Sequence, residues 1–223
     1  MNIYPEIKFA VTDWDVIVIG HLRWNRYFGE GPQMPSRGDP STCTSTIVRG
    51  KDFNGKDYVL LIDPTMRWTP EAFYFDVNRR TGLKPENITH CYCTHHHLDH
   101  YDGFKYFPNA IWYTAEPVAE ILWKEARTID GSKIAGIKGE FLPGVYALPL
   151  PGHTPTLHGI AFSYNGKKVV VAGDAVMTRH HFVNNTTEYQ PDPAYNEIAA
   201  QTIFDLKSSF DIVVPGHDNV IVR

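Results

Sequence analysis

Thr94-His95-His96-His97-Leu98-Asp99-His100 is the stretch that decides the fold prediction for this chain. It follows an apolar run, residues 88–94, whose composition is typical of a buried strand. A strand that ends there would place His95 and His97 beside one cation, and Asp99 and His100 beside a second. Imidazole and carboxylate groups are ligands that zinc prefers. The stretch therefore predicts a metal site at the end of a strand.

Three adjacent histidines are also compatible with a solvated loop or with the remnant of a tag. Here the histidines are internal to the chain and follow a strand. Three distant segments supply further ligands. His153 lies in a Gly/Pro turn at 151–155, Asp174 ends the apolar run 169–174, and His217 follows the run 212–216. Each segment is a strand end followed by a candidate ligand, so we expect several strands to converge on one site.

The order of these residues resembles the metallo-β-lactamase superfamily, with residues 94–100 matching its His-x-His-x-Asp-His signature. The resemblance spans roughly residues 43–223. Asp63 matches an early strand-end aspartate of the same family. Its position before Pro64 is equally typical of a turn, so its role as an outer carboxylate supporting the metal loop stays open.

The resemblance implies an α/β fold, an αββα sandwich formed by one domain over residues 1–223. It also implies a set of seven metal ligands. The first cation would be held by His95, His97 and His153, the second by Asp99, His100 and His217, and Asp174 would bridge them.

This ligand set implies a hydrolase with two divalent cations, most often zinc, with iron or manganese as alternatives. A hydroxide that bridges the cations would cleave an ester-like bond, which could be a carboxylic ester, lactone, thioester or phosphoester. Asp99 is the expected catalytic residue, since it can orient the hydroxide and carry its proton to the leaving group. The bridging aspartate argues against antibiotic hydrolysis, because true metallo-β-lactamases usually lack it.

Two other functions stay open. A phosphodiesterase or nuclease is opposed by the net charge of −4, which provides no broad basic surface for nucleic acid. An iron-dependent dioxygenase acting on persulfides would need only two histidines and Asp174. A glutathione thioesterase of this fold is disfavoured, because the chain ends soon after His217 and leaves no room for that family's helical domain.

A small-molecule substrate is expected, and its pocket is the least determined part of the prediction. Residues 23–40 form a long segment with several aromatic side chains, for which a lid over the metal site and packing on the core rim are both reasonable interpretations. Lactonases of this fold often carry a tyrosine three residues after the bridging aspartate, where this chain has Met177. The candidate pocket residues are Trp24, Tyr27, Phe28, Arg179, His181 and Tyr189.

Hydrophobic residues make up 43% of the 223 residues and charged residues 21%, which is ordinary for a globular protein. No apolar run is long enough to cross a bilayer, and the N-terminus lacks the features of a signal peptide. We therefore expect a cytoplasmic protein without membrane contact; its oligomeric state is open, with a homodimer among the alternatives. Periodicity predicts helices at 69–82, 116–127 and 192–208, and strands at 15–22, 43–48, 58–62, 88–94, 110–113, 145–148, 159–164, 168–172 and 211–214.

Overall fold

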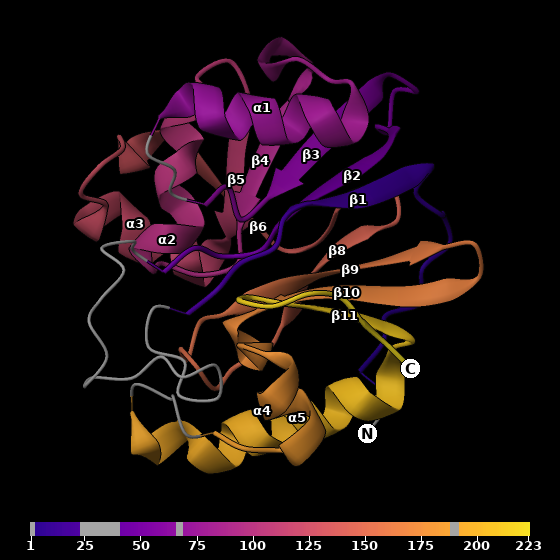
Figure 1. Cartoon of the computed structure of the whole chain (residues 1–223), viewed down its shortest axis with the longest axis vertical. Coiled ribbons are helices and arrows are strands. Elements are labelled where there is room, and N and C mark those ends of the chain that lie inside the picture. The colour runs from indigo at the N-terminus through magenta and orange to yellow at the C-terminus, as the bar shows by residue number, and fades with distance from the viewer. Residues whose placement is uncertain (1–2, 23–40, 66–68, 188–191) are drawn as a thin grey trace.

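The computed structural model describes residues 3–22, 41–65, 69–187 and 192–223. Within them, two six-stranded sheets lie face to face, with helices on the outer face of each (Figure 1). The first sheet comes from the N-terminal half of the chain and the second from the C-terminal half. The predicted αββα sandwich is confirmed.

The first sheet has the strand order β1-β2-β3-β4-β5-β6. β1 to β3 are antiparallel, and β3 to β6 are parallel to one another. Their bounds are Asp13–Val18, Ser45–Lys51, Asp57–Ile62, His90–Cys93, Ile111–Ala115 and Ile134–Ile137. The hairpin between β2 and β3 turns near Gly55, whose φ of 79° is the left-handed conformation that glycine adopts at low cost. The parallel arrangement brings the carboxyl ends of β3 and β4 to one edge of the sheet.

The second sheet has the strand order β12-β11-β10-β9-β8-β7. Only β10 and β11 are parallel, so their carboxyl ends also lie at one edge. The bounds, from β7 to β12, are Gly139–Leu142, Val145–Pro149, His158–Tyr164, Lys167–Gly173, Ile212–Pro215 and Ile221–Val222.

Three clusters of buried apolar side chains correspond to the three interfaces of the sandwich. The cluster between the sheets joins Leu60 and Tyr92 of the first sheet to Phe162 and Val171 of the second. Leu61, the neighbour of Leu60, points the opposite way and packs with the helices of the first half. This alternation is what a strand buried on both faces requires.

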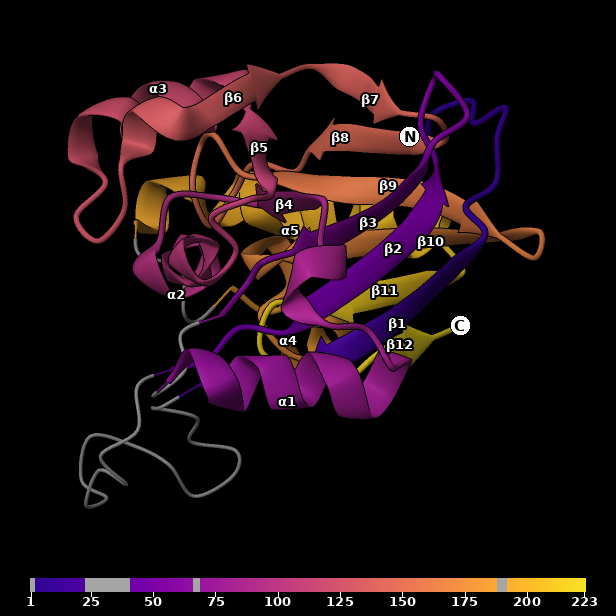
Figure 2. The same cartoon turned by 90° about the horizontal axis from the view of Figure 1, so that it is seen from above.

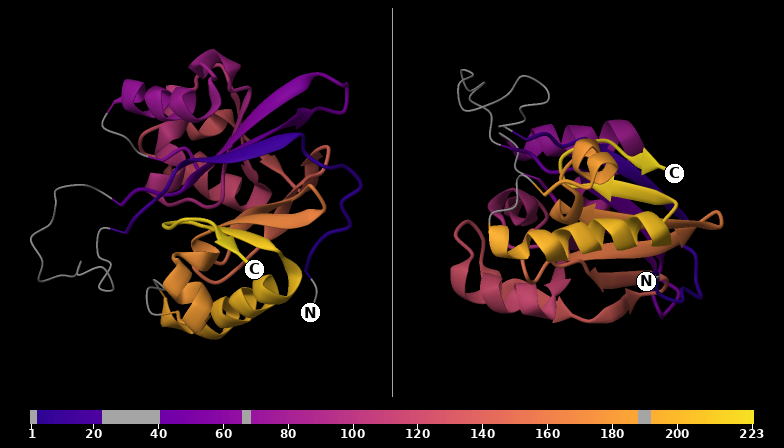
Figure 3. Two further views of the ribbon diagram at one scale, coloured as in Figure 1. Left: turned by 45° about the vertical axis from the view of Figure 1, so that its right-hand side comes forward. Right: turned by 90° about the horizontal axis from the view of Figure 1, so that it is seen from below.

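Helices cover the outer face of each sheet. α1 (Pro70–Thr81), α2 (Leu98–Tyr101) and α3 (Glu116–Glu125) contribute to the cluster outside the first sheet. α4 (Arg179–Asn184) and α5 (Asn196–Ser209) contribute to the one outside the second. Figures 2 and 3 show α1 and α5 on opposite sides of the two sheets.

The predicted helix boundaries agree closely with the structure for α1. Thr69 is its N-cap, with Oγ1 accepting from the Ala72 N–H at 3.3 Å, and Gly82 closes it in the left-handed conformation at φ 71°. α5 begins four residues later than predicted, because Asp192 caps a short 3₁₀ turn at 193–195 instead.

Other expectations were wrong or incomplete. Trp123, in the helix predicted at 116–127, is 48% exposed, and its Nε1 donates to the Ile134 carbonyl at 2.9 Å. β6, β7, β12 and α4 were not predicted, since each is too short for its periodicity to stand out. In the part of the chain that the structure describes, no helix combines the length and apolar character needed to span a bilayer.

Candidate metal centre

The candidate ligands lie at the edge where the carboxyl ends of β4, β10 and β11 meet. His95 and His97 follow β4 directly, and α2 then begins at Leu98, so its first turns carry the next two ligands, Asp99 and His100. The remaining three follow strand ends of the second sheet: His153 after β8, Asp174 after β10 and His217 after β11. The predicted convergence of strand ends is therefore observed.

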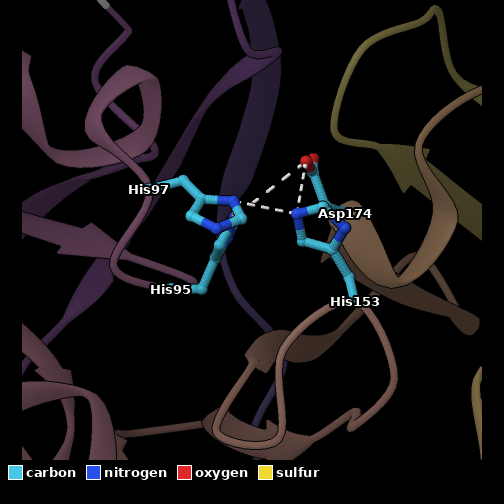
Figure 4. A group of neighbouring side chains, drawn as sticks. All are labelled: His95, His97, His153 and Asp174. Carbon is cyan, nitrogen blue, oxygen red and sulfur yellow. Dashed lines mark hydrogen bonds and ion pairs between the residues drawn. The ribbon is translucent and has the colours of Figure 1, made fainter. Parts of the chain in front are cut away.

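Three imidazoles and one carboxylate form the first group of ligand atoms (Figure 4). Nδ1 of His97 lies 3.0 Å from Nε2 of His95 and 2.9 Å from Nε2 of His153. Nε2 of His153 is 3.2 Å from Oδ2 of Asp174. Four potential ligand atoms within 4.8 Å of one another, three of them from buried residues, could hold one cation.

Asp99, His100 and His217 form the second group. Oδ1 of Asp174 lies 3.3 Å from Nε2 of His100, and Oδ2 lies 3.3 Å from Nε2 of His217. Oδ2 of Asp99 is 3.6 Å from the same His217 nitrogen. The Asp174 carboxylate thus lies between the two groups and contacts both.

Hydrogen bonds behind the imidazoles aim their Nε2 atoms into the site. Nδ1 of His100 is 3.0 Å from Oδ2 of Asp63, and Nδ1 of His217 is 2.9 Å from the Thr42 carbonyl. Both oxygens only accept, so each Nδ1 carries a proton, and in the neutral imidazole Nε2 is the atom that would bind a metal. In metal sites, a hydrogen bond to the second ring nitrogen of a ligand histidine normally produces this arrangement.

Asp63 supports both groups from behind. It is fully buried and its φ of 49° is left-handed. Its carboxylate also accepts from the N–H and hydroxyl of Thr94, at 2.7 and 2.9 Å. Because the Thr94 hydroxyl donates to Asp63, its oxygen is left to accept from Nδ1 of His95 at 3.1 Å. One carboxylate therefore contacts a ligand of the second group directly and a ligand of the first group through Thr94.

Buried polar atoms that make no hydrogen bond indicate whether a cation would fit this site. Among the described residues, Nε2 of His100 and Oδ1 of Asp174 are buried without a hydrogen-bond partner. Such atoms are costly to bury unless something else satisfies them. Nitrogen and oxygen donors directed at one another fit divalent zinc, so the residues present fit a metal centre.

Burial and charge divide the histidines of the metal-free protein into two kinds. Burial lowers the pKa of His95 well below its usual range and that of His97 to about 4, so both are neutral at pH 7. Burial also opposes charge on His100, but nearby acidic groups, Cys43 and Asp174 foremost, raise its pKa well above the usual value. Although burial would raise the pKa of Asp174, His217 and His100 hold it well below its usual range. The Asp174 carboxylate is therefore ionised.

A cavity of about 340 Å³ opens onto these ligands. Besides the ligands, the described residues that line it are mainly aliphatic: Leu22, Ser41, Leu98 and Met177. A larger cavity of about 570 Å³ lies between β1, α1 and residues 219–220, but it contains none of the seven candidate ligands. Because candidate ligands line the smaller cavity and not the larger one, the smaller cavity is the candidate active site.

None of the six predicted pocket residues is among the described residues that line this cavity. Trp24, Tyr27, Phe28 and Tyr189 lie outside the described residues. Arg179 begins α4, and its guanidinium N–H donates to the Val220 carbonyl at 2.7 Å.

His181 is buried, with Nδ1 2.7 Å from the Thr178 hydroxyl. Neither Arg179 nor His181 is among the described residues that line the cavity. Leu22, Ser41, Leu98 and Met177 were not predicted. Leu98 could have been found from its place between two ligands, whereas Leu22 and Ser41 flank residues 23–40 and carry no local signal.

The family model of the metallo-beta-lactamase superfamily matches residues 38–217 of the chain. An N-acyl homoserine lactonase of a Bacillus species is 28% identical over 202 residues, which cover 85% of this chain and 77% of the lactonase. Metallo-beta-lactamase domain-containing protein 1 of Xenopus laevis is 27% identical over 164 residues, covering 71% of this chain and 65% of that protein. The chain thus spans under two thirds of the Xenopus protein.

Solved structures show the same fold. A putative metallo-beta-lactamase from Thermotoga maritima superposes with a TM-score of 0.67 at 20% identity, covering 95% of this chain and 99% of that one. AiiA of B. thuringiensis, as the F107W mutant with N-decanoyl-L-homoserine bound at its active site, superposes with a TM-score of 0.65 at 18% identity, covering 94% of each chain.

Proposed function

Since this chain belongs to the metallo-beta-lactamase superfamily and is a metal-dependent hydrolase, we propose that it uses two divalent cations to hydrolyse a neutral carboxylic ester or lactone. The observation that carries the proposal is the position of Asp174. Its two carboxylate oxygens face ligand nitrogens of both groups, at 3.2 to 3.3 Å. A carboxylate with ligands on both sides is suited to bridging two cations.

The first cation would be held by His95, His97 and His153, and the second by Asp99, His100 and His217, with zinc as the proposed metal. When bound, the cations supply Lewis-acid polarisation of the scissile carbonyl and lower the pKa of a water molecule to about 7. The lowered pKa of His97 and His95 supports this assignment, because neutral imidazole is the form that binds metal.

Asp99 is the proposed catalytic residue. Its side chain is 21% exposed, whereas the His217 and Asp174 side chains beside it are at most 4% exposed. It therefore faces the cavity in which substrate would bind. Its carboxylate can accept a proton from the attacking water and return it to the leaving oxygen as the acyl C–O bond breaks. The products are a carboxylic acid and an alcohol, or a single hydroxy acid from a lactone.

The walls of the cavity support an uncharged, partly aliphatic substrate. Leu22, Leu98 and Met177 supply its apolar surface, and no lysine or arginine is among its described lining residues. A phosphodiester would leave its charge without a basic partner outside the cations, so the described lining favours a carboxylic ester. The Bacillus relative named as an N-acyl homoserine lactonase supports a lactone in particular. The second ligand group supports two cations, whereas a persulfide dioxygenase would need one.

Hydrolysis by the zinc-loaded protein tests the proposal on matched series of aliphatic lactones, esters, thioesters and phosphodiesters. We expect the highest kcat/KM on the lactones or esters. The Asp99→Asn variant should lose at least about 100-fold in kcat, as general acid–base groups contribute that much. Asp57→Asn, which changes an exposed carboxylate of the β2–β3 hairpin, is the control. Preferred cleavage of phosphodiesters, or full activity of Asp99→Asn, would overturn the proposal.

A further inference from the structure

The loop that carries His217 is held by the opposite half of the molecule. His217 follows β11 of the second sheet and donates its N–H to the Met177 carbonyl at 2.8 Å, but its imidazole Nδ1 contacts the Thr42 carbonyl, in the segment 42–44 that leads into β2 of the first sheet. Figure 1 shows β2 and β11 in the two separate layers. The orientation of this ligand therefore depends on contacts between the two sheets.

Three hydrogen bonds connect residues 42–44 to residues 216–218. The Thr44 N–H donates to the Gly216 carbonyl at 2.5 Å, and the Thr44 hydroxyl donates to the Asp218 carbonyl at 2.8 Å. Between them, the Thr42 carbonyl accepts from Nδ1 of His217 at 2.9 Å. The residues on both sides of His217 are thus fixed by Thr44, and the imidazole itself by the neighbouring backbone.

The segment that follows β1 completes this arrangement. Gly20 donates its N–H to the Thr44 hydroxyl at 3.0 Å, so that hydroxyl is used both as acceptor and as donor. A Cβ at residue 20 would overlap the Thr42 carbonyl oxygen, which is the acceptor for His217. Gly20 therefore lets the backbone after β1 approach close enough to lock residues 42–44 in place. It lies outside the part of the chain that the family model matches, residues 38–217.

We propose that Thr44 is a positioning residue for His217. Through its hydroxyl and N–H, it fixes the loop at 216–218 so that Nε2 of His217 faces Asp174 and Asp99. Thr44 is 1% exposed and is not among the described residues that line the cavity, so we place its effect on His217 in the loop at 216–218. That a second cation binds at His217 rests on the proposed function. The role of Thr44 in holding the loop rests on the hydrogen bonds given above.

Three variants test this role. Thr44→Val keeps the shape of the side chain and removes the hydroxyl, so it loses the bonds to Asp218 and Gly20. Thr44→Ser keeps the hydroxyl and with it the bonds to Asp218 and Gly20. Thr46→Val is the matched control: Thr46 is equally buried, lies two residues further along the same segment, and its hydroxyl has no hydrogen-bond partner among the described residues.

Two readouts apply to each variant. Competition with a chelator gives the affinity of each zinc ion, and NMR of the protein with ¹⁵N-labelled histidine follows hydrogen exchange at Nδ1 of His217. For Thr44→Val we expect about tenfold weaker binding of the second zinc ion only, as loss of a supporting partner typically causes, together with faster exchange at His217. Thr44→Ser and Thr46→Val should resemble the wild-type protein in both.

The inference would be overturned if Thr44→Val changed neither the affinity for the second zinc ion nor hydrogen exchange at Nδ1 of His217. Equal effects in Thr46→Val would also overturn it. If Thr44→Val does not fold, Gly20→Ala tests the same contacts, because the added methyl group would overlap the Thr42 carbonyl and the Thr44 N–H, which hold His217 and Gly216. A wild-type protein that binds no zinc would overturn the proposed function instead, and His217 exchange in the metal-free protein would still decide the role of Thr44.

Discussion

Oδ2 of Asp63 lies 3.0 Å from Nδ1 of His100, although 37 positions of the sequence separate the two residues. Both are completely buried. The contact fixes which nitrogen of His100 carries the proton, and so directs the other nitrogen toward Asp174.

Asp63→Asn should therefore weaken binding of the second zinc ion by about 10-fold to 100-fold. An amide in place of Oδ2 donates and cannot accept, which leaves the His100 N–H and the Thr94 hydroxyl without their acceptor. Asparagine tolerates the left-handed backbone at this position, so the loss reflects the carboxylate rather than strain. We also expect about 3 kcal/mol lower stability of the metal-free protein in urea denaturation. Asp102→Asn, at another buried carboxylate paired with Lys105, should lower stability without changing zinc affinity.

Removal of the cations should lower the melting temperature. Buried ligand atoms that make no hydrogen bond, such as Nε2 of His100 and Oδ1 of Asp174, carry a desolvation cost that a bound cation would offset. Zinc at about 1,000 times its Kd would stabilise the folded state by about 4 kcal/mol, or about 10 °C for a chain of this size. Dialysis against a chelator followed by scanning calorimetry measures the shift, and added zinc should reverse it. His95→Ala should show a smaller shift, and a wild-type protein indifferent to the chelator would contradict the prediction.

Gly216→Ala should disturb the bridging carboxylate directly. A Cβ at residue 216 would overlap Oδ1 of Asp174, so either the loop or the carboxylate must move. We expect a loss of about 1 to 3 kcal/mol in stability from overpacking, and a fall in kcat well beyond what that stability loss explains. Gly50→Ala is the control, since its Cβ would overlap the Tyr58 ring at a distance from the ligands. Equal activity in the two variants would argue against a bridging role for Asp174.

Leu98→Ser should raise KM for long aliphatic substrates by about 10-fold and leave kcat nearly unchanged. Leu98 is 37% exposed and lines the cavity, so its contribution is to substrate binding more than to the core. Ile111→Ser, at a side chain that is 50% exposed on β5 and absent from the described cavity lining, should change neither constant. Steady-state kinetics over a series of acyl chain lengths checks both.

That the candidate ligands lie together was predictable from the sequence because His95, Asp174 and His217 follow strands whose apolar runs are easily recognised. The run before Thr94 and the runs before Asp174 and His217 end in the same way, and parallel strands bring such ends to a common edge. The periodicity of α1 and its cap at Thr69 were equally clear.

The supporting contacts were not predictable, because they depend on how the two halves of the chain pack. Nothing in the local sequence of Thr44 indicates that its hydroxyl bonds to Asp218, which is 174 positions away. The residues that line the cavity were also not predictable. Met177 and Leu22 come together only once both sheets are assembled, whereas Arg179, expected in the pocket from its nearness to Asp174 in sequence, is not among the described lining residues.

Anomalous diffraction from crystals of the zinc-loaded protein tests the central claim most directly. We predict two peaks on either side of the Asp174 carboxylate, one among His95, His97 and His153 and the other among Asp99, His100 and His217. A single peak in the presence of excess zinc, or peaks away from these side chains, would contradict the account.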